Sequence, residues 1–467
     1  MTLHQTELAK VVRSRGTTTR QLACFAFAAY VVLSSFGHLF LGEQLASGYI
    51  DEIAVAAFGV LAITVAGSSL PGAPLRILAV ALLIFTWGSV SALSNPLLIG
   101  APLRQLIGTA SLIDLKPYFV AASFLMILLS MDRRNQIYLI RYICVTFVLL
   151  SLFNLVFCLL DILRGADIHG RALETRAGIP VPNGIYELKF MSAFTSLMGF
   201  ICILALQPTF RSRNLYRLLL GTMGFGLLIA LSAKEIIAAF AVLALSVSAG
   251  QRGWRLFAIL GLSALVILLT STDNPLSEAI NGRFNLFLGG RVDTVRAAMY
   301  VKAPTVANDF FPLGAGWGTF GSSASRDVFY SPLYGHYGIS TLWGGSVRYG
   351  SFLVDTFWPK IIGEQGWIGF AIYIWLWLLC GRTAVKLAFK TNRDLMANFG
   401  LYSFFALLLV SAATPVYNYA DGCIVSGIGM ALLFPSMKRK GRRNRLPPRR
   451  VRGPGLASTP YRALRSW

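Results

Sequence analysis

Residues 138–162 read YLIRYICVTFVLLSLFNLVFCLLDI, a run in which only Arg141 and Asp161 carry a charge. A helix needs about 20 apolar residues to cross the hydrocarbon of a bilayer, so this run predicts a membrane-spanning helix. Similar runs recur along the 467 residues, which are 55% hydrophobic and 13% charged. Soluble domains are about 25% charged. The sequence therefore predicts an all-α, polytopic integral membrane protein.

We expect about twelve transmembrane helices, near 21–41, 52–70, 75–94, 112–131, 138–162, 185–206, 215–232, 235–250, 254–271, 364–380, 397–414 and 418–436. The first run is long for a signal peptide and only weakly marked by a cleavage site, so we expect it to stay as an anchor. All six cysteines fall inside apolar runs, which predicts neither a structural disulfide nor a zinc site.

The distribution of charge predicts the orientation. The segment 1–20 is rich in Lys and Arg, whereas the next loop carries Glu43, Asp51 and Glu52 and no basic residue. Because cytoplasmic loops carry the excess of basic residues, both termini of a twelve-span chain are expected in the cytoplasm. The transmembrane domain is then 21–436, and the loops 164–184, 232–235 and 272–363 face outwards. The last of these, between helices 9 and 10, is the largest.

The segment 437–467 is a basic tail with eleven Lys or Arg and no acid, which is half of the formal net charge of +22. Beside a membrane span, such a tail is expected to attract anionic membrane lipid rather than nucleic acid. Its prolines and glycines predict a disordered cytoplasmic segment.

Basic residues in the outer loops are contrary to this charge rule, so their presence there has to be explained. Arg171 and Arg176 lie in the first large outer loop, Lys234 in the short turn, and Arg291 and Arg296 in the long loop. Guanidinium groups suit phosphate oxygens, so the set could hold a lipid-linked diphosphate. The alternative is that each pairs with a neighbouring acid or a lipid headgroup, as surface ion pairs commonly do.

The long outer loop also contains the segment 312–320, Pro-Leu-Gly-Ala-Gly-Trp-Gly-Thr-Phe. Glycines such as Gly314, Gly316 and Gly318 let a loop adopt positive φ and let a ligand approach the backbone. Trp317 supplies a flat face of the kind that stacks on sugars, although an aromatic belt at the membrane interface is equally consistent. The acids nearest the tenth span, Asp355 and Glu364, are functional candidates because charge at a membrane boundary is costly.

The order of these features resembles the O-antigen ligase and Wzy-type polysaccharide polymerase superfamily of bacterial envelope proteins. Members have a basic turn after a mid-chain helix, then a long periplasmic loop with an arginine segment, a glycine turn and a closing Glu-x-Gly-x-x-Gly. The corresponding segments here are 232–234, 290–296, 312–320 and 364–369, with Pro182-Asn183 also similar. One position departs, because Asp355 stands nine residues before the glutamate, where histidine is common.

The resemblance implies a GT-C-like architecture in the bacterial cytoplasmic (inner) membrane, and transfer of a glycan from undecaprenyl diphosphate to a sugar hydroxyl at its outer face. The candidate catalytic residues are Asp355, Arg291 and His336, with either Asp355 or His336 as the base. The candidate substrate-binding residues are Lys234, Arg296, Arg176, Arg171, Gly314, Gly316, Gly318, Trp317 and Glu364. Because a diphosphate is already a good leaving group, no metal or other cofactor is expected.

Polymerisation of lipid-linked repeat units into an exopolysaccharide or O-antigen is the main hypothesis, with a flippase and a chain-length regulator as expected partners. A ligase that passes finished glycan to a lipid A core or a protein is the nearest alternative. A lipid-linked oligosaccharide flippase or secondary carrier is a different class; carriers usually show two related halves and charges deep in the spans. A peptidoglycan glycosyltransferase of the shape-and-division family is a further alternative.

Overall fold

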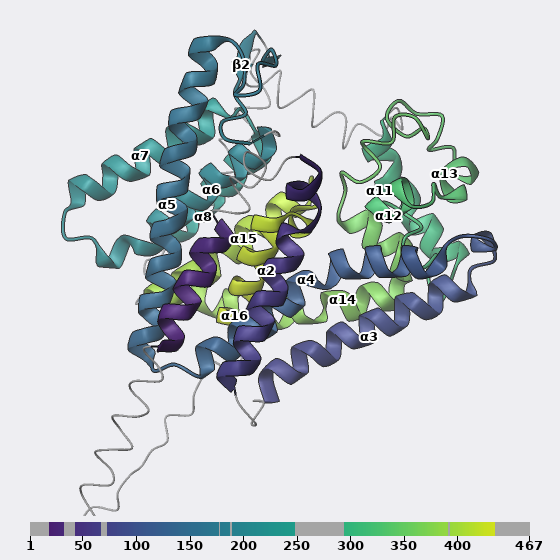
Figure 1. Ribbon diagram of the computed structural model, residues 1–467, viewed down its shortest axis with the longest axis horizontal. Helices are drawn as coiled ribbons and strands as arrows, with labels where there is room; N and C mark the ends of the chain where they lie inside the picture. The colour runs from purple at the N-terminus through teal and green to yellow at the C-terminus, as the bar shows by residue number, and fades with distance from the viewer. Residues whose placement is uncertain are drawn as a thin grey trace, which may run out of the picture.

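The computed structural model describes residues 18–31, 43–66, 72–176, 178–186, 189–247, 294–390 and 393–434. These residues are mostly helical, as predicted (Figure 1). Five helical segments are long and apolar enough to cross a membrane: α3 (Gly72–Ser94), α4 (Leu103–Leu129), α5 (Arg133–Arg164), α6 with η2 (Lys189–Thr209) and α14 (Trp358–Ala388). The chain is therefore an all-α membrane protein by length and composition of its helices.

The other predicted spans also overlap helices, except 254–271, which lies outside the described residues together with Arg291 and the tail 437–467. They correspond to the helical residues 18–31, α2 (Glu43–Ala66), α7 (Arg213–Ile229), α8 (Ala233–Val247), α15 (Leu395–Ser411) and α16 (Ala420–Leu433). Several of these are shorter than a full crossing requires, so the number of twelve spans stays a prediction.

Local sequence signals explain where several helices begin and end. Asp132, Ser212 and Asp394 precede α5, α7 and α15, and each side chain accepts a hydrogen bond from a backbone N–H of the first helical turn. Such caps satisfy donors that have no partner inside the helix. At the far end of α5, Gly165 adopts φ 68°, the left-handed conformation that commonly stops a helix.

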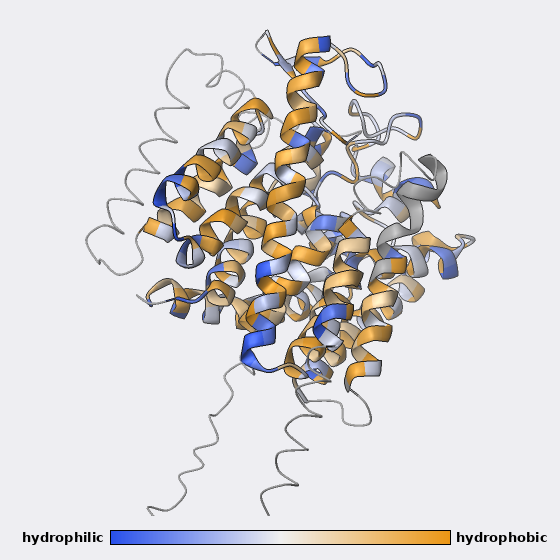
Figure 2. Cartoon of the chain, turned by 60° about the vertical axis from the view of Figure 1, so that its left-hand side comes forward, coloured by the Kyte–Doolittle hydropathy of each residue, from blue (hydrophilic) through white to orange (hydrophobic). Residues whose placement is uncertain are grey.

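Helix α4 lies at the centre of the bundle and packs against α2, α3 and α16, while α5 packs against α6. In Figure 2 apolar residues run along the helices and polar residues gather towards their ends. Apolar side chains on the outside of the bundle stay exposed, as at Leu82 (64%) and Leu93 (66%) of α3. An exposed apolar surface of this kind suits contact with lipid.

Residues 294–357, which we call the loop unit, form the described part of the predicted long outer loop. They fold into α11 (Val295–Asp309), α12 (Ser323–Asp327) and α13 (Pro332–His336), around a core that includes Met299, Phe320 and Tyr334. The unit lies against α14 and α4 (Figure 1). The long loop thus contains a small folded body.

The loop 164–184, which is predicted to face outwards, contains the only strands among the described residues. β1 (Glu174–Arg176) and β2 (Ile179–Val181) pair antiparallel, with Glu174 opposite Val181. This hairpin was not predicted, because each strand is too short to show an alternating pattern. The short 3-10 helices η1 (Pro96–Leu98), η2 (Gln207–Thr209) and η3 (Val416–Asn418) complete the described elements.

Connections that alternation assigns to the same side of the membrane also lie in contact. At the end of the bundle that carries the loop unit, which we call the loop end, Tyr300 donates to the carbonyl of Ala412. At the opposite end, Arg133 pairs with Asp394 and Arg393 donates to the carbonyl of Leu245 at 3.1 Å. Helix α5 runs between the two ends over about 48 Å. The membrane side on which each end lies stays a prediction.

Candidate functional site

The loop unit holds an ion pair between Arg296 and Asp355. Arg296 lies in the first turn of α11, which Thr294 caps, and its Nε is 3.1 Å from Asp355 Oδ2. A second guanidinium nitrogen contacts the same oxygen, and the guanidinium carbon lies 5.1 Å from the centroid of the Phe352 ring. The side chains are 32% and 25% exposed. Two of the predicted site residues are therefore together, and a ligand can reach them.

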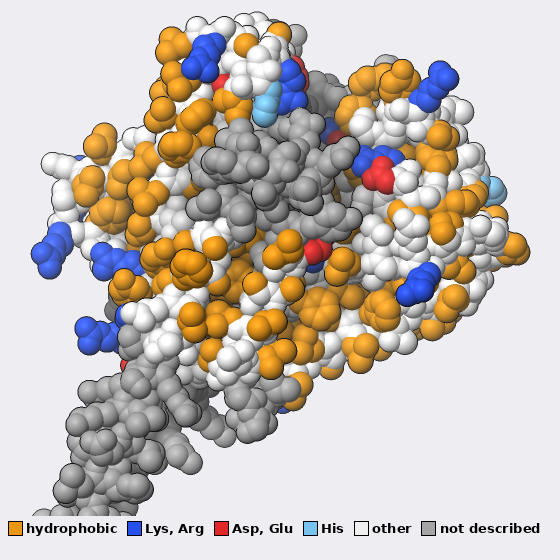
Figure 3. Space-filling view, viewed as in Figure 1, with side chains coloured by type: hydrophobic (Ala, Val, Ile, Leu, Met, Phe, Trp, Pro, Cys, Tyr) orange, Lys and Arg blue, Asp and Glu red, His pale blue; other side chains and the backbone are white. Residues whose placement is uncertain are grey.

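Two more charges adjoin this pair. Arg326 forms a two-pronged contact with Asp327, Nε to Oδ1 at 2.6 Å and a terminal nitrogen to Oδ2 at 2.7 Å. The hydrogen bond to Asp327 raises the pKa of Arg326, and the nearby Asp355 adds to this effect. In Figure 3 basic and acidic side chains lie side by side on the surface of the loop unit. The pair thus sits in a local group of two guanidinium and two carboxylate groups.

Tyr419, just before α16, connects this group to the rest of the loop end. Burial raises the pKa of its hydroxyl; the negative charge of Asp355 adds to the shift, and Arg296 and Arg326 oppose it. The ring lies 4.5 Å from that of Phe190. Tyr419 was not predicted as a site residue, although it follows the short connection that alternation places on the same side as the long loop.

Lys234 also lies near Phe190. Its ammonium group is 5.8 Å from the centroid of that ring, donates a hydrogen bond to the hydroxyl of Thr414, and is 3.7 Å from Glu235. Between Lys234 and Tyr419 lies a cavity of about 10 Å³, lined by Phe190, Met191, Phe194, Glu235, Val410, Thr414, Val416 and Tyr419. That is room for about one water molecule, so a larger ligand requires these helices to separate.

Arg176 contacts the backbone just before the turn that carries Lys234. It donates to the carbonyl of Leu231 at 2.7 Å, and Leu231 adopts φ 42°, which is unusual for a residue with a side chain. Burial lowers the pKa of Arg176, and the negative charge of Glu235 opposes that shift. The predicted cations Arg176 and Lys234 are thus near each other, although they lie in different loops.

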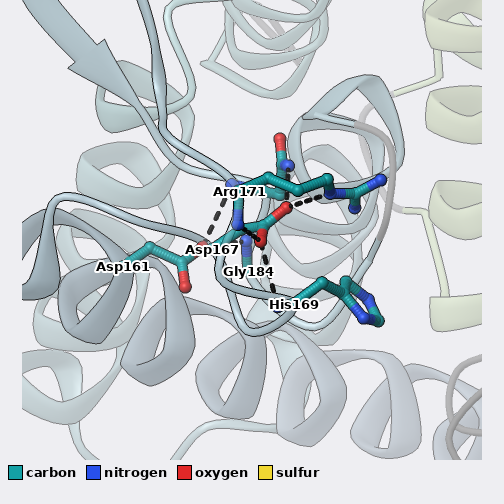
Figure 4. Close-up of polar contacts among 6 residues, drawn as sticks. Asp161, Asp167, His169, Arg171 and Gly184 are labelled. Carbon is teal, nitrogen blue, oxygen red and sulfur yellow. Dashed lines mark hydrogen bonds and ion pairs between the residues drawn. The ribbon is translucent and has the colours of Figure 1, made fainter.

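Arg171 belongs instead to a network within its own loop (Figure 4). Asp167 accepts hydrogen bonds from the backbone of His169 and Arg171 and from Arg171 Nε, at 2.8 to 2.9 Å, and from Asn183 at 3.1 Å. Burial alone would raise the pKa of Asp167, but these hydrogen bonds hold it below its usual value. The contacts give Arg171 an ordering role in the loop, and its predicted role in binding substrate stays a prediction.

Residues 312–320, the glycine turn, connect the loop unit to the membrane helices through backbone hydrogen bonds. Helix α14 is interrupted at Gly366, which adopts φ 62° and ψ −174°. The carbonyls of Gly363 and Glu364 accept from the amides of Ala315 and Gly316, at 2.9 and 2.8 Å. The next carbonyl, that of Gln365, accepts from Trp87 Nε1 at 3.0 Å. These contacts compensate for the helical hydrogen bonds that the kink disturbs.

The glycines of the turn are needed for this packing. A Cβ on Gly314 would lie 2.2 Å from the backbone nitrogen of Gly366, and one on Gly316 would lie 2.3 Å from the backbone of Ala92. Both have positive φ, 84° and 93°. Gly318, also at positive φ, packs on Leu106 of α4. Contact with protein therefore explains these glycines, and a direct contact with substrate stays a prediction.

Trp317 and Glu364 are also fully buried beside this turn. Trp317 donates to the carbonyl of Phe85 in α3 at 3.2 Å, and Glu364 Oε1 accepts from the amide of Phe320 at 3.1 Å. Both side chains connect the loop unit to membrane helices. Their predicted part in substrate binding would require this packing to open.

His336 ends α13 and is exposed, with its ring packed on that of Tyr337 at 4.8 Å. Tyr337 in turn donates to Asp309. No described contact joins His336 to Asp355. Of the two candidate bases, only Asp355 adjoins other predicted site residues, while Arg291 lies outside the described part of the chain.

A second ion pair, which the sequence analysis missed, lies inside the bundle. Lys360 of α14 contacts Asp114 of α4, and each side chain is only 1% exposed. Lys116, in the same turn of α4, contacts Glu52 of α2. The signal was present in the sequence, because Asp114 and Lys116 interrupt an apolar run. Charged side chains therefore lie inside the bundle as well as at the loop end.

Comparison with known proteins assigns no family. No family model matches the chain, and no curated protein matches it significantly. The geometry of the loop end is therefore the basis for a function.

Proposed function

We propose that this protein is a glycosyltransferase that polymerises lipid-diphosphate-linked oligosaccharide repeat units at the outer face of a bacterial inner membrane. The observation that carries the proposal is the partly exposed Arg296–Asp355 pair, which adjoins Arg326 and Tyr419 at the loop end. It combines guanidinium groups, which suit phosphate oxygens, with a carboxylate. Both are required for transfer from a diphosphate to a hydroxyl.

In this proposal the ion pair is the resting form of the site. Diphosphate oxygens compete with Asp355 for the guanidinium group of Arg296, since phosphate and carboxylate bind it in the same way. The bond from the anomeric carbon to the phosphate oxygen breaks, and the diphosphate leaves with the charge that Arg296 and Arg326 neutralise. Asp355, released from its partner, accepts the proton of the acceptor hydroxyl as the new glycosidic bond forms.

Lys234 and Arg176 are the second group of cations, and Lys234 lies near Phe190, whose ring packs on that of Tyr419. We assign them to the lipid-linked part of a substrate or product, because Lys234 lies in the first turn of α8 and Arg176 contacts the turn before it, both apart from the loop unit. The small cavity between the two groups would widen when a glycan enters. A hydroxyl that stays protonated, as at Tyr419, can donate a hydrogen bond to a sugar or phosphate oxygen there.

The test is the profile of lipid-linked glycans in cells that lack the protein. The proposal requires single repeat units to accumulate on lipid diphosphate while long glycan disappears. Long lipid-linked chains that persist without transfer would indicate a ligase. The wild-type gene returned on a plasmid must restore long glycan, and a variant with Arg296→Ala must not, at equal amounts of membrane protein.

Transport is the second candidate, and one observation favours it. The buried Asp114–Lys360 pair and the Lys116–Glu52 pair place charges inside the bundle, as in many transporters. Each of these charges has an opposite partner, however, which equally suits a structural role. Repeat units trapped on the cytoplasmic leaflet of the deletion strain would support a flippase instead of a polymerase.

A further inference from the structure

A cavity at the end of the bundle opposite the loop unit is separate from the proposed catalytic site. Its volume is about 380 Å³, and it lies where α6 and η2 turn into α7. Gln207, Phe210, Arg213, Tyr216 and Arg217 line it. Cavities that bind small ligands are typically about 300–1,000 Å³, so this one is large enough for a small polar group.

The charge around the cavity is positive. Arg213 and Arg217 lie one turn apart on α7 and are exposed, and neither forms an ion pair with another residue in the described part of the chain. A third arginine of the described residues, Arg393, donates a hydrogen bond to the hydroxyl of Tyr402 at 3.3 Å. Asp394, the residue after Arg393, pairs with Arg133. Among the described residues that line the cavity there are therefore two cations and no carboxylate.

The same helix carries an exposed apolar face. Leu215, Leu218, Phe225 and Leu228 are 48%, 66%, 51% and 51% exposed, and their spacing places them on one side of α7. Arg213 and Arg217 fall next to this side, at the first turns of the helix. Figure 3 shows basic side chains at the left edge of the molecule, where the turn into α7 lies in Figure 1. Acyl chains on the apolar face would bring a headgroup to the arginines.

We propose that this cavity binds the phosphate of an anionic phospholipid headgroup. The two guanidinium groups would contact phosphate oxygens, Gln207 and Tyr216 would hydrogen-bond to the remaining headgroup atoms, and the acyl chains would lie along α7. A free phosphate ion shares the same headgroup chemistry but gains nothing from the apolar face. This difference separates the two sources of phosphate.

The test uses the full-length protein in detergent micelles, titrated with phosphatidylglycerol or phosphatidylcholine and examined by native mass spectrometry. We expect phosphatidylglycerol to bind preferentially. The double variant with Arg213→Gln and Arg217→Gln should bind it about tenfold or more weakly, since two charge-assisted contacts are lost. Arg104→Gln, which removes an exposed arginine at the first turn of α4, is the matched control and should bind like the wild type.

A second arm adds inorganic phosphate alone. The proposal requires millimolar phosphate to leave the bound lipid in place; displacement at equal concentrations would overturn the lipid as occupant. Equal binding of both lipids, or unchanged binding by the double variant, would overturn the site itself. Arg213→Lys with Arg217→Lys keeps the charge and should retain preference for the anionic lipid, which separates loss of charge from loss of fold.

Discussion

Two pairs of opposite charge in this molecule differ chiefly in their exposure. Arg296 and Asp355 are about one-third and one-quarter exposed in the loop unit, whereas Lys360 and Asp114 are each 1% exposed between α14 and α4. An exposed pair can exchange its partner for a ligand at small cost. A buried pair cannot, because separating it leaves a charge without solvent. An ion pair of the same kind is thus suited to ligand binding in the loop unit and to structural support between α14 and α4.

The strongest test of this comparison is Asp355→Asn. The amide keeps the shape but cannot act as a base, so we expect polymer formation to fall by roughly 10²–10⁴-fold, with unchanged amounts of folded protein. Polymer per unit of membrane protein is the measurement. Asp327→Asn, which alters the neighbouring pair with Arg326, is the control and should have a much smaller effect. Full activity of Asp355→Asn would exclude this residue as the base.

Breaking the buried pair should instead affect folding. Lys360→Met leaves Asp114 without its partner, and we expect a loss of about 3–5 kcal/mol of stability. Unfolding of the purified protein in detergent would measure it. The double variant with Asp114→Leu should be markedly more stable than the single one, because no charge then remains at that position. If the single variant is as stable as the wild type, the pair does not support the fold.

Tyr419→Phe sharpens the comparison on the exposed side. The substitution removes one hydroxyl beside Asp355 and leaves the ring on Phe190, so we expect about a 2–10-fold loss of polymer formation, the worth of one hydrogen bond. Thermal stability should change little. Tyr349→Phe, at an exposed tyrosine of the loop unit, serves as the control. Equal effects of both substitutions would remove Tyr419 from the site.

The smallest effect is expected at the end of the bundle opposite the loop unit. Arg133 and Asp394 form a pair whose side chains are 53% and 46% exposed. Because water and salt screen such pairs, Arg133→Gln should change stability by less than about 1 kcal/mol. The unfolding assay used for Lys360→Met measures it. A loss as large as that of Lys360→Met would show that exposure does not determine the energetic role of these pairs.

The helical fold could be predicted because apolar length is a local property of the sequence. Residues 138–162 identify α5 almost to its ends, and even the short α8 was expected from its apolar run. The interruption of α14 at Gly366 was not predicted, because it depends on amides from Ala315 and Gly316, about fifty positions earlier. Periodicity within one helix contains no information about such a distant donor.

The candidate site was predictable only in part. Arg296 and Asp355 were named separately from charge and resemblance, and their contact required the fold of the loop unit. Tyr419 was missed because a tyrosine beside an apolar run ordinarily indicates a membrane interface. For Gly314, Gly316 and Trp317 the composition could not distinguish a ligand-binding loop from a tightly packed one. Their burial was decided by α3, which precedes them by some 200 residues, and by α14, which follows them by about 50.

The contact between the glycine turn and helix α14, which is interrupted at Gly366, has a consequence for the cooperativity of unfolding. The amides of Ala315 and Gly316 bond to carbonyls of a helix long enough to span the membrane, so they can exchange with solvent only when that helix separates from the turn. Their hydrogen exchange should therefore be as slow as that of the bundle itself, although they belong to a loop. The loop unit and the membrane helices would then unfold as one cooperative body.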